Sequence, residues 1–397
     1  MSQKRVLMIV ENLPVPADRR VWQEATALSK AGYKVCVICP TGKGFDRRYE
    51  RVDDIHIYRH PLPVDARNSL GYIAEYSAAL FWEFVLAWKI FFRHGFDVIH
   101  GCNPPDLIFL VALVFKPLGK KFIFDHHDIN PELFKIKYGK EGMMYRILGI
   151  LERLTFFSAN VSIATNDSYR RIAIERGGMA PDKVFVVRSG PDLSKLRACE
   201  PRSSLAKGRR FLVGYIGVMG SQDDVDKLLR VAHCLVHRMG RHDVQFLLIG
   251  GGPELARMKA LAEELEVGDY VTLSGFLLGD ELCSAMSSID IGVGPDAKND
   301  YNDKCTMNKI MEYMAFSKPV VQFDLTEGRA TAHEASLYIK DNNEEEMARC
   351  IVDLLDDPEK RAQMGQLGRK RIEDVLDWKY EVPHLLAAYT AVSGSQE

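Results

Sequence analysis

The chain has 397 residues, of which 47% are hydrophobic and 27% are charged, and its formal net charge at pH 7 is −2. This length suits two or three domains of ordinary size rather than a single core. A net charge so close to zero excludes the broad basic field that attracts nucleic acids. We therefore expect no nucleic-acid partner, and we expect any anion to be bound by local groups.

The N-terminal residues and the cysteines bear on export and on metal binding. Only Val6–Val10 is apolar before Glu11, which is too short a run for a signal peptide, so we expect the chain to stay in the cytoplasm. Among eight scattered cysteines, Cys36 and Cys39 form the only close pair, inside an apolar run typical of a buried strand. No second Cys or His pair has ligand spacing, so we expect free buried thiols and no metal site.

Strand-like apolar runs alternate with longer helical segments through the first half of the chain, which indicates a parallel sheet flanked by helices. A helix is expected over Arg19–Lys30, where Val21, Ala25 and Leu28 have helical spacing and Gly32 is the stop signal. The expected strands are Arg5–Val10, Lys34–Cys39, Ile55–Tyr58, Asp97–His100, Lys121–Asp125, Val161–Thr165 and Lys183–Val187.

A second alternation follows a shift in composition to Ser, Pro, Lys and Arg that begins near Ser189 and continues to Gly208. We predict a first domain over residues 1–190, a linker over 191–208, a second domain over 209–376, and a C-terminal helix over 377–397 that returns to the first domain. Two doubly wound sheets bind ligands at the carboxyl ends of their strands, so we expect function between the domains. The elements expected in the second domain are the strands Phe211–Ile216, Gln245–Ile249, Tyr270–Leu273, Ile289–Val293 and one at Val320, and the helices Val225–Met239 and Glu254–Glu266.

The stretch 302–323 reads as a loop, a helix and a strand. Thr306 or Asn308 can cap this helix, and Lys309 and Glu312, three residues apart, share one face. A helix N-terminus presents unpaired amide N–H groups to a phosphate, and Glu312, one turn further on, can accept hydrogen bonds from sugar hydroxyls. An ordinary surface helix with a Lys/Glu pair fits the same residues.

Polar residues follow the strand that ends at Asp125. His126 or His127 can bind a sugar hydroxyl or a phosphate, and Asp128 can orient the imidazole. A purely structural His–Asp pair is the alternative. The arginines Arg19 and Arg20 begin a helix behind the first loop, and we favour solvated side chains there over phosphate contact.

Glycines follow two strands of the second domain. Gly250 and Gly251 open a turn into a helix, and Gly217 follows the first strand. Glycine lets the backbone approach a ligand and leaves amides for an anion, but tight turns require glycine as well.

Residues 70–96 are unusually aromatic, yet Glu75, Glu83 and Lys89 make them too charged to span a bilayer. We favour burial of this helix in the core. Contact with an anionic membrane surface is the alternative, because the periodicity does not separate the two and a series of lysines lies downstream. These are Lys116, Lys120, Lys121, Lys135, Lys137 and Lys140.

Taken together, these segments resemble the retaining, nucleotide-sugar-dependent glycosyltransferases of family 4. That family has the GT-B architecture, an α/β fold of two facing Rossmann-like, doubly wound domains, and the resemblance runs over nearly the whole chain. Its strongest parts are Leu247–Glu254, Val271–Phe276, Asp290–Val293, Ile310–Ala315 and Lys318–Val321.

The resemblance implies roles for individual residues. Glu312 matches the second Glu of the family's E-x7-E motif, which binds the donor ribose, and His127 matches a histidine near the donor sugar. The residues that match the diphosphate-binding backbone are Thr306, Met307 and Asn308, and those that match the base-contacting segment are Phe276 and Leu277.

Three departures from the family pattern change the expected charge of the donor site. Lys304 occupies the position of the first Glu of the motif, and the Arg and Lys that neutralise the diphosphate match Val218 and Asp223. Leu13–Asp18 replaces the family's glycine-rich first loop. Because a buried anion needs partners, we hypothesise that Lys304 and Lys309 supply the missing positive charges.

The resemblance implies transfer of a sugar from a nucleotide diphosphate, most often uridine-linked, to an acceptor hydroxyl, with retention and without a metal or cofactor. The acceptor is either a lipid-linked sugar at the inner face of the membrane, as in surface polysaccharide or glycolipid assembly, or a soluble molecule. Two other readings remain open. One is a different GT-B enzyme, either an inverting transferase or a sugar-nucleotide epimerase; the other is a catalytically silent partner subunit, which the residues at 304, 218 and 223 favour.

Overall fold

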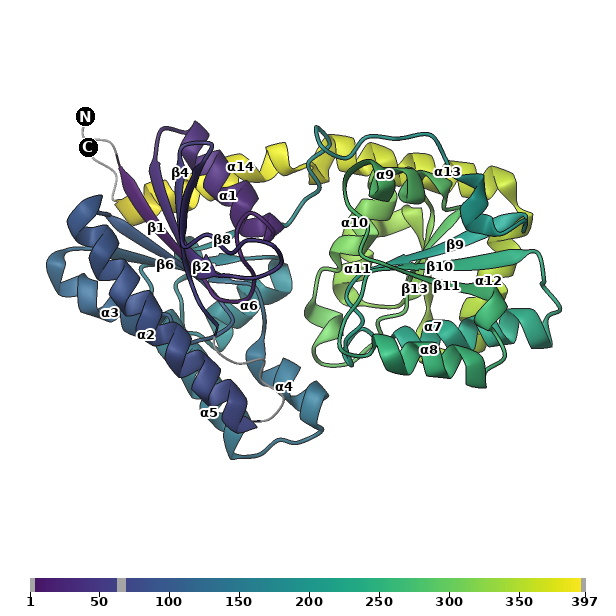
Figure 1. Cartoon of the computed structure of the whole chain (residues 1–397), viewed down its shortest axis with the longest axis horizontal. Coiled ribbons are helices and arrows are strands. Elements are labelled where there is room, and N and C mark those ends of the chain that lie inside the picture. The colour runs from purple at the N-terminus through teal and green to yellow at the C-terminus, as the bar shows by residue number, and fades with distance from the viewer. Residues whose placement is uncertain (1–3, 63–68, 394–397) are drawn as a thin grey trace. The chain divides into compact units, whose positions relative to one another are not determined.

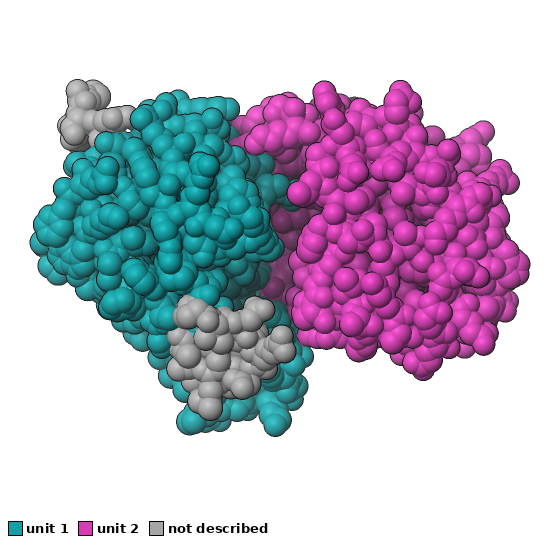
Figure 2. Space-filling view, in the orientation of Figure 1, with its two compact units in different colours: residues 1–188, 381–397 teal, residues 189–380 magenta. Residues whose placement is uncertain are grey.

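The computed structural model describes residues 4–62 and 69–393. The chain divides into two compact units (Figure 2), of which unit 1 comprises residues 1–188 and 381–397, and unit 2 comprises residues 189–380. Each unit is an α/β domain built around its own sheet, with helices on both faces (Figure 1). The α/β class predicted from the alternation of strands and helices is therefore confirmed.

Within its described residues, unit 1 has a sheet of eight strands in the order β3-β4-β2-β1-β5-β6-β7-β8. All neighbours are parallel except β3, which pairs antiparallel with β4 at the edge. Every strand expected in this unit is confirmed to within one or two residues, whereas β3 was missed because it is short, polar and half exposed. The strands are β1 (Arg5–Val10), β2 (Lys34–Pro40), β3 (Tyr49–Val52), β4 (Ile55–His60), β5 (Val98–Cys102), β6 (Lys121–His126), β7 (Val161–Ala164) and β8 (Val184–Val186).

The expected helix over Arg19–Lys30 is confirmed as α1, and it begins where the Asp18 carboxylate accepts a hydrogen bond from the Val21 N–H group at 3.1 Å. The other helices are α2 (Ser69–Arg93), α3 (Phe109–Phe115), α4 (Asn130–Tyr138), α5 (Met143–Ser158) and α6 (Asp167–Glu175), with short turns η1 (Lys116–Leu118) and η2 (Pro181–Lys183). Among the helices of the described residues, none is long and apolar enough to cross a membrane.

The expected C-terminal helix is present as α14 (Trp378–Ser393). Its first residues, 378–380, belong to unit 2 and the remainder to unit 1. Within unit 1 the Tyr389 side chain is fully buried, and its hydroxyl is hydrogen-bonded to Nδ1 of His100 on β5 at 2.8 Å. This contact fixes the end of the chain to the sheet of unit 1.

The sheet of unit 2 has six parallel strands in the order β11-β10-β9-β12-β13-β14. The expected strands are again confirmed, and β14 is an addition that the alternation did not reveal. The strands are β9 (Phe211–Ile216), β10 (Val244–Ile249), β11 (Val271–Gly275), β12 (Ile291–Gly294), β13 (Val320–Phe323) and β14 (Ser336–Ile339).

The helices of unit 2 cover both faces of this sheet. The two faces are lined by separate apolar clusters, one around Val213 and Phe246 and the other around Leu212 and Leu247, as expected for a doubly wound fold. The α-helices are α7 (Val225–His233), α8 (Leu255–Glu264), α9 (Gly279–Ser288), α10 (Asn308–Ala315), α11 (Thr326–Ala332), α12 (Glu344–Asp356) and α13 (Pro358–Arg371). The shorter helical turns are η3 (Ser203–Ala206), η4 (Cys234–Arg238), η5 (Gly268–Tyr270), η6 (Asn302–Lys304), η7 (His333–Ala335), η8 (Lys340–Asn342) and η9 (Ile372–Leu376).

The stretch 191–208, predicted as a linker from its composition, lies in unit 2. Its backbone is held by α9, because the Cys199 and Arg202 N–H groups donate to the hydroxyls of Ser287 and Ser288 at 3.1 and 2.7 Å. Three leucines in the same stretch pack against the core of unit 2, namely Leu193, Leu196 and Leu205. These leucines lack a regular period, which is why the segment looked unstructured in sequence.

Candidate functional site

The loops that follow β9 and β10 start at the same level of the sheet of unit 2. Ile216 and Ile249, the last residues of the two strands, are paired, so Gly217 and Gly250 come next on neighbouring strands. The loops are bonded to each other, because the Gly217 N–H group donates to the Ile249 carbonyl oxygen and the Met219 N–H group to that of Gly251, both at 3.0 Å. The predicted Gly217, Gly250 and Gly251 therefore lie together at the carboxyl edge of the sheet.

A glycine is required at position 250 both by the backbone conformation and by the lack of space for a Cβ atom. Its φ of +128° is disfavoured for residues with a side chain, and a Cβ atom there would lie 1.9 Å from the Gly217 carbonyl oxygen. Its N–H group donates to the Gly275 carbonyl oxygen at the end of β11. The glycine thus joins three consecutive strand ends, and this structural demand exists whether or not a ligand binds.

Lys309, on the first turn of α10, points toward the same loops. Its Nζ lies 2.7 Å from Asp296 Oδ1 and 4.8 Å from the centre of the Tyr215 ring, and a Cβ atom on Gly217 would lie 3.6 Å from its Cε. Burial acts to lower the pKa of Lys309, but attraction to Asp296 and Asp223 outweighs it and raises the pKa above its ordinary value. Lys309 is therefore a buried, permanently charged ammonium rather than half of a surface pair.

Two further carboxyls lie near Asp296, and both hold protons unusually strongly. Burial, followed by the charge of Asp296, raises the pKa of Asp223 to about 6 against the opposing effect of Lys309. Burial likewise raises the pKa of Asp224 to about 6. Asp223 matches the position of the family's diphosphate-neutralising lysine. This position is therefore occupied by an acid that can become neutral near physiological pH.

The loop before α10 is held in place by its own polar contacts. The Ala297 N–H group donates to Asp224 Oδ2 at 2.9 Å, and Asn302 Nδ2 donates to the Ala297 carbonyl oxygen at 2.9 Å. Lys304 Nζ donates to the Asp300 carbonyl oxygen at 2.8 Å, so this ammonium is held on its own loop. Lys304 lies before α10, as predicted. Its ammonium is bonded to a carbonyl oxygen of its own loop, whereas the ammonium of Lys309 is paired with the Asp296 carboxylate.

The start of α10 corrects one prediction. The residue at the N-cap is Met307, which makes no side-chain capping bond, so neither Thr306 nor Asn308 caps the helix. The backbone of Thr306, Met307 and Asn308 nevertheless forms the entry to α10, where amide N–H groups point along the helix axis. Glu312, one turn further on, is half-buried.

Tyr313 fixes α10 against the sheet. Its hydroxyl accepts a hydrogen bond from the Ile216 N–H group at 3.0 Å and donates one to the Val293 carbonyl oxygen at 3.2 Å. The ring lies directly over Gly292, where a Cβ atom would come within 2.3 Å of it. The position of Glu312, the next residue back, is thereby set relative to the end of β9.

Phe276 and Leu277 follow the end of β11, as the predicted base-contacting segment. Phe276 is 67% exposed, and its ring lies next to Gly251, 3.0 Å from where a Cβ atom would stand. Leu277 is half-buried and packs against the core of unit 2. Of the two, Phe276 presents an exposed aromatic ring beside the glycines, whereas Leu277 packs in the core.

In unit 1, His127 follows β6 and its Nε2 lies 2.5 Å from Asp125 Oδ2. The carboxylate that orients this imidazole is therefore Asp125, at the end of the strand, and not Asp128, which was predicted. Asn103 holds the loop, because its Oδ1 accepts from the His127 N–H group at 2.6 Å. The neighbouring His126 is fully buried between Phe156 and Tyr169 and belongs to the core.

We expected solvated side chains for Arg19 and Arg20. This prediction is wrong for Arg20, which is buried, whereas Arg19 is exposed. The Arg20 side chain is buried and donates two hydrogen bonds to Asp125, from Nη2 to Oδ1 at 2.8 Å and from Nε to Oδ2 at 3.2 Å. Burial alone would raise the pKa of Asp125, but the charges of Arg20 and His127 hold it well below its ordinary value. A permanently ionised Asp125 therefore faces His127.

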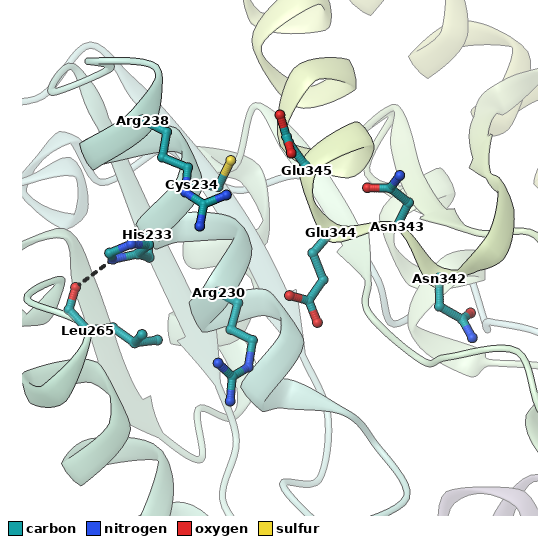
Figure 3. A pocket seen from close by; sticks show the side chains of 9 residues that line it. All are labelled: Arg230, His233, Cys234, Arg238, Leu265, Asn342, Asn343, Glu344 and Glu345. Atoms are coloured by element: carbon teal, nitrogen blue, oxygen red, sulfur yellow. Dashed lines mark hydrogen bonds between the residues drawn. The ribbon is translucent and has the colours of Figure 1, made fainter.

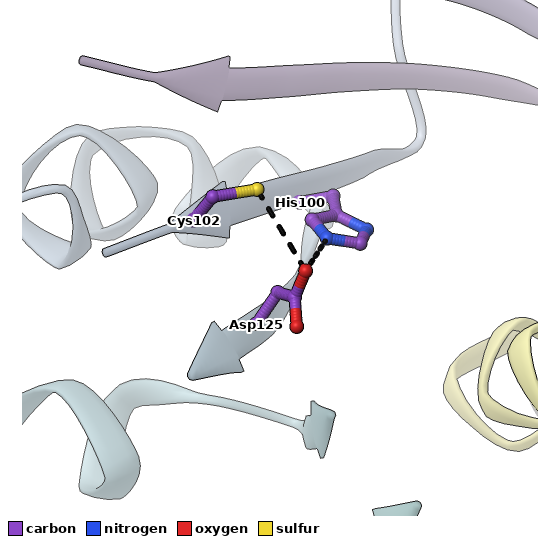
Figure 4. Close-up of side chains that lie close together, drawn as sticks. All are labelled: His100, Cys102 and Asp125. Atoms are coloured by element: carbon purple, nitrogen blue, oxygen red, sulfur yellow. Dashed lines mark hydrogen bonds and ion pairs between the residues drawn. The ribbon is translucent and has the colours of Figure 1, made fainter. Parts of the chain in front are cut away.

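Figure 4 shows two further buried side chains, His100 and Cys102, that lie against the same carboxylate. His100, Cys102 and Asp125 offer one potential metal ligand each, and these three atoms lie within 4.8 Å of one another. The chemistry opposes a metal here, because burial raises the pKa of the Cys102 thiol well above its ordinary value and Arg20 already neutralises Asp125. The three side chains form a hydrogen-bonded support for the His127 loop.

The sequence matches known glycosyltransferases in both units. Residues 17–195 match the family described as Glycosyltransferase Family 4, and residues 210–357 match Glycosyl transferases group 1. The chain belongs to glycosyltransferase family 4/group 1 and has the GT-B fold. Its two sheets confirm the expected pair of Rossmann-like domains.

Curated relatives of this glycosyltransferase are distant. It is 24% identical over 250 residues to 2-deoxystreptamine glucosyltransferase from Streptomyces kanamyceticus, covering 60% of this chain and 62% of the relative. It therefore spans less than two thirds of that protein's length. It is also 21% identical over 399 residues to the MMP alpha-(1->4)-mannosyltransferase from Mycolicibacterium hassiacum, covering 91% of both chains.

Solved structures of low identity share the whole fold. Sucrose-phosphate synthase from Thermosynechococcus elongatus superposes with a TM-score of 0.78 at 18% identity, covering 98% of both chains. Anabaena HepE in complex with UDP-glucose superposes with a TM-score of 0.72 at 14% identity, covering 97% of this chain and 99% of the other. At these identities the likeness establishes the fold of this glycosyltransferase and leaves its substrates to be argued from its residues.

Sequence reasoning missed part of the glycosyltransferase's unit 1 site. Arg20 and Glu24 both face Asp125, and their i, i+4 spacing on an otherwise apolar helix face was the available signal. Burial raises the pKa of Glu24 well above its ordinary value. His100 and Tyr389 complete the network from β5 and α14, and no local pattern links residues so far apart in sequence.

A hollow elsewhere in unit 2 is a different feature (Figure 3). It has a volume of about 460 Å³ and lies between the α7–η4 helix and the start of α12. Arg230 and Arg238 line one side, and Glu344 and Glu345 the other. None of the predicted donor-site residues of the glycosyltransferase lines it.

Proposed function

We propose that this cytoplasmic glycosyltransferase moves a sugar from a nucleotide diphosphate, with uridine favoured, to an acceptor hydroxyl with retention of configuration. The observation that carries this proposal is the position of the Lys309 ammonium beside Gly217 and beneath the loops that end β9 and β10. A buried cation next to glycine backbone at a helix N-terminus is a suitable site for a diphosphate. The pathway we propose is surface polysaccharide or glycolipid assembly.

Each part of the donor is assigned to a part of unit 2. Glu312 binds the ribose hydroxyls, and the backbone of residues 306–308 binds the diphosphate. Phe276, whose ring is exposed, stacks on the base, and Leu277 supports that segment from the core. The glycines at 217, 250 and 251 allow the backbone to come close, and Lys304 lies on the loop next to the phosphate-binding residues.

The charge of this site limits how it binds an anion. Lys309 is already paired with Asp296, so a diphosphate adds negative charge to a group that contains two further acids, Asp223 and Asp224. Because the pKa of each acid is raised to about 6, each can take up a proton when the anion binds, and this uptake reduces the negative charge of the site. We propose that proton uptake by Asp223 partly replaces the cation that the family usually has at this position.

The proposed reaction needs no metal. The acceptor oxygen forms a bond to the anomeric carbon while the bond from that carbon to the diphosphate breaks, and the acceptor proton passes to the departing phosphate on the same face. The protein contributes positioning and charge stabilisation. Within unit 1, Asp125 and Arg20 hold the ring of His127, which matches the histidine that the family has near the donor sugar. Support for uridine comes from Anabaena HepE, which shares this fold and whose structure is a complex with UDP-glucose, and from the family's common choice.

A thermal-shift screen tests the donor assignment. A nucleoside diphosphate that binds the folded chain raises its Tm, so we expect UDP and a UDP-sugar to stabilise the protein while uridine and inorganic phosphate do not. Absence of a shift with the uridine, guanosine and adenosine diphosphates alike would contradict the donor site.

Stereochemistry and turnover are separate questions. NMR of the purified product shows the anomeric configuration directly, and an inverted product would refute retention. Binding of a nucleotide sugar without any release of nucleoside diphosphate would instead favour a catalytically silent subunit. The acceptor is proposed to be a sugar, either lipid-linked or soluble.

A further inference from the structure

Helix α5 of unit 1 carries an apolar stripe on its outward face. Met143, Ile147, Ile150, Leu154 and Phe157 recur at alternating spacings of four and three residues, so they lie in one line along the helix. All five are exposed, and Met143 and Phe157 at the two ends are 78% and 87% exposed. A line of five exposed apolar side chains along one helix is unusual for a protein surface that faces only water.

The opposite face of α5 already supplies what the fold requires. Glu152, Thr155, Phe156 and Ser158 are buried there, and the Glu152 carboxylate is paired with Arg176, Nε to Oε2 at 2.6 Å. The helix is therefore fixed to unit 1 by its inner face. In the outer stripe Ile147 and Leu154 are partly covered, at 38% and 43% exposed, whereas the ends of the stripe are open and remain available to a partner.

Neighbouring helices extend the apolar surface. Helix α3 packs against both α5 and α2, as Figure 1 shows at the lower left of unit 1. Leu113 and Val114 on α3 and Leu118 on η1 are exposed, and Lys116 Nζ donates to the Ser158 carbonyl oxygen at the end of α5 at 2.6 Å. Among the α2 side chains that the structure describes, the exposed large apolar ones are Phe81, Val85 and Phe92.

The charges around the stripe are predominantly positive. Residues 133–158 contain five basic residues, Lys135, Lys137, Lys140, Arg146 and Arg153, and only two acids. Of these acids, Glu152 is buried and Glu141 is paired with Lys135 at 2.7 Å. Residues 109–121 add three lysines and no acid. This local excess contrasts with the net charge of −2 for the whole chain.

We propose that the outward face of α5, together with the adjoining residues of α3 and η1, docks onto an anionic lipid bilayer. An apolar stripe bordered by basic residues is the pattern of a helix that lies in the plane of the interface, with apolar side chains among the acyl chains and cations at the headgroups. The charge selects a membrane over a second copy of this chain, because two copies would bring two basic surfaces together. This docking is independent of sugar transfer.

The experiment measures binding of the full chain to vesicles, without donor or acceptor. We expect co-sedimentation with phosphatidylglycerol-containing vesicles, weaker binding to pure phosphatidylcholine, and loss of binding with added salt. Ile150→Ser/Phe157→Ser should lower the partition coefficient at least tenfold, because two side chains no longer enter the bilayer. Val375→Ser, at an exposed apolar position of unit 2, is the matched control and should bind like wild type.

A second pair of variants tests the charge. Lys140→Gln/Arg146→Gln should weaken binding to anionic vesicles by roughly fivefold for each residue and leave binding to neutral vesicles unchanged. Arg349→Gln, which alters an exposed arginine on α12, is its control. Equal melting temperatures show that the variants fold, since the altered side chains are exposed.

Two results would overturn the proposal. One is vesicle binding that is absent, or that the double serine variant retains in full. The other is a dimer in sedimentation velocity that Ile150→Ser/Phe157→Ser converts to a monomer, which would assign the stripe to a second copy. Failure of docking leaves the thermal-shift response to nucleotides unaffected, so it is distinguishable from failure of the donor site.

Discussion

Lys309 Nζ and Asp296 Oδ1 lie 2.7 Å apart, and both side chains are buried beside the loop that follows β9. A cation at this place is suitable for a diphosphate, yet its charge is already matched. Donor binding therefore has to reorganise charge, with Asp223 and Asp224 as the groups that can change protonation.

Removing Lys309 should weaken nucleotide binding, but Lys309→Ala also leaves Asp296 buried without its partner and should destabilise the fold by about 3–5 kcal/mol. The double variant Asp296→Asn/Lys309→Met removes both charges and avoids that penalty. We expect it to fold with a Tm close to wild type and to bind UDP at least tenfold more weakly, since a charge-assisted hydrogen bond is lost. Isothermal titration calorimetry measures the affinity.

The matched control is Lys259→Ala, an exposed lysine on α8 that should leave the affinity unchanged. Unchanged affinity in the double variant would show that Lys309 does not contact the diphosphate.

Donor affinity should depend on pH through Asp223. The free protein holds the pKa of this carboxyl at about 6, and an arriving anion favours its protonated form. Affinity for a nucleotide sugar should therefore fall as pH rises above about 6, by up to about tenfold per pH unit for one group. The diphosphate of a nucleotide sugar is esterified at both ends and does not titrate in this range.

Asp223→Asn should bind more tightly than wild type at pH 8 and should show a flatter profile. Calorimetry at several pH values gives both slopes. Identical slopes for the variant and wild type would show that Asp223 does not take up a proton when the donor binds.

Arg20 should be far more important for stability than its neighbour. Arg20→Ala leaves the fully buried Asp125 without its bidentate partner, and we expect a loss of about 3–5 kcal/mol in the free energy of unfolding. Arg19→Ala, one residue earlier and exposed, should change it by less than about 0.5 kcal/mol. Chemical denaturation of the two variants under the same conditions decides the point, and equal effects would contradict the buried pair.

Glu11 should make unit 1 less stable at alkaline pH. Burial, then the charges of Glu83 and Glu75, raises its pKa to about 9 from an ordinary value of 4.5. The folded state therefore holds one more proton than the unfolded state between these values, and stability falls as pH rises through this window, by at most about 1.4 kcal/mol per unit. Glu11→Gln stays neutral and should be more stable than wild type at pH 8.

Thermal melts from pH 5 to pH 9 measure this effect, with Glu175→Gln on the exposed surface of α6 as control. A Glu11→Gln variant whose Tm follows the wild-type pH profile would show that this carboxyl is ionised in the folded protein.

The positions of the strands and of the glycines after them were within reach of the sequence, because apolar runs and glycines are local signals. Gly217 and Gly250 follow strands as predicted, and the structure adds that these strands are neighbours. The pairing of Lys309 with Asp296 was not predictable, since the two residues are 13 apart and Asp296 lies in an irregular loop. Arg20 was misjudged for a related reason, as its partner Asp125 is 105 residues away.

Helix α5 shows a different limit of sequence reasoning. A line of apolar residues at helical spacing ordinarily predicts burial, and only the structure reveals that this line faces outward. The aromatic helix α2 was expected in the core, with membrane contact as the alternative. One side of it is buried, including Leu86 and Ile90, whereas Phe81 and Phe92 are exposed.

The central claim is that unit 2 presents a nucleotide sugar for transfer, with Glu312 on the ribose. The most direct measurement is release of nucleoside diphosphate from UDP-, GDP- and ADP-sugars by wild type and by Glu312→Gln. We predict slow release from at least one nucleotide sugar by wild type, and release about tenfold to a hundredfold slower at limiting donor in the variant, because hydrogen bonds to a charged group are lost. Equal rates in the two proteins, or no release from any donor, would contradict the account.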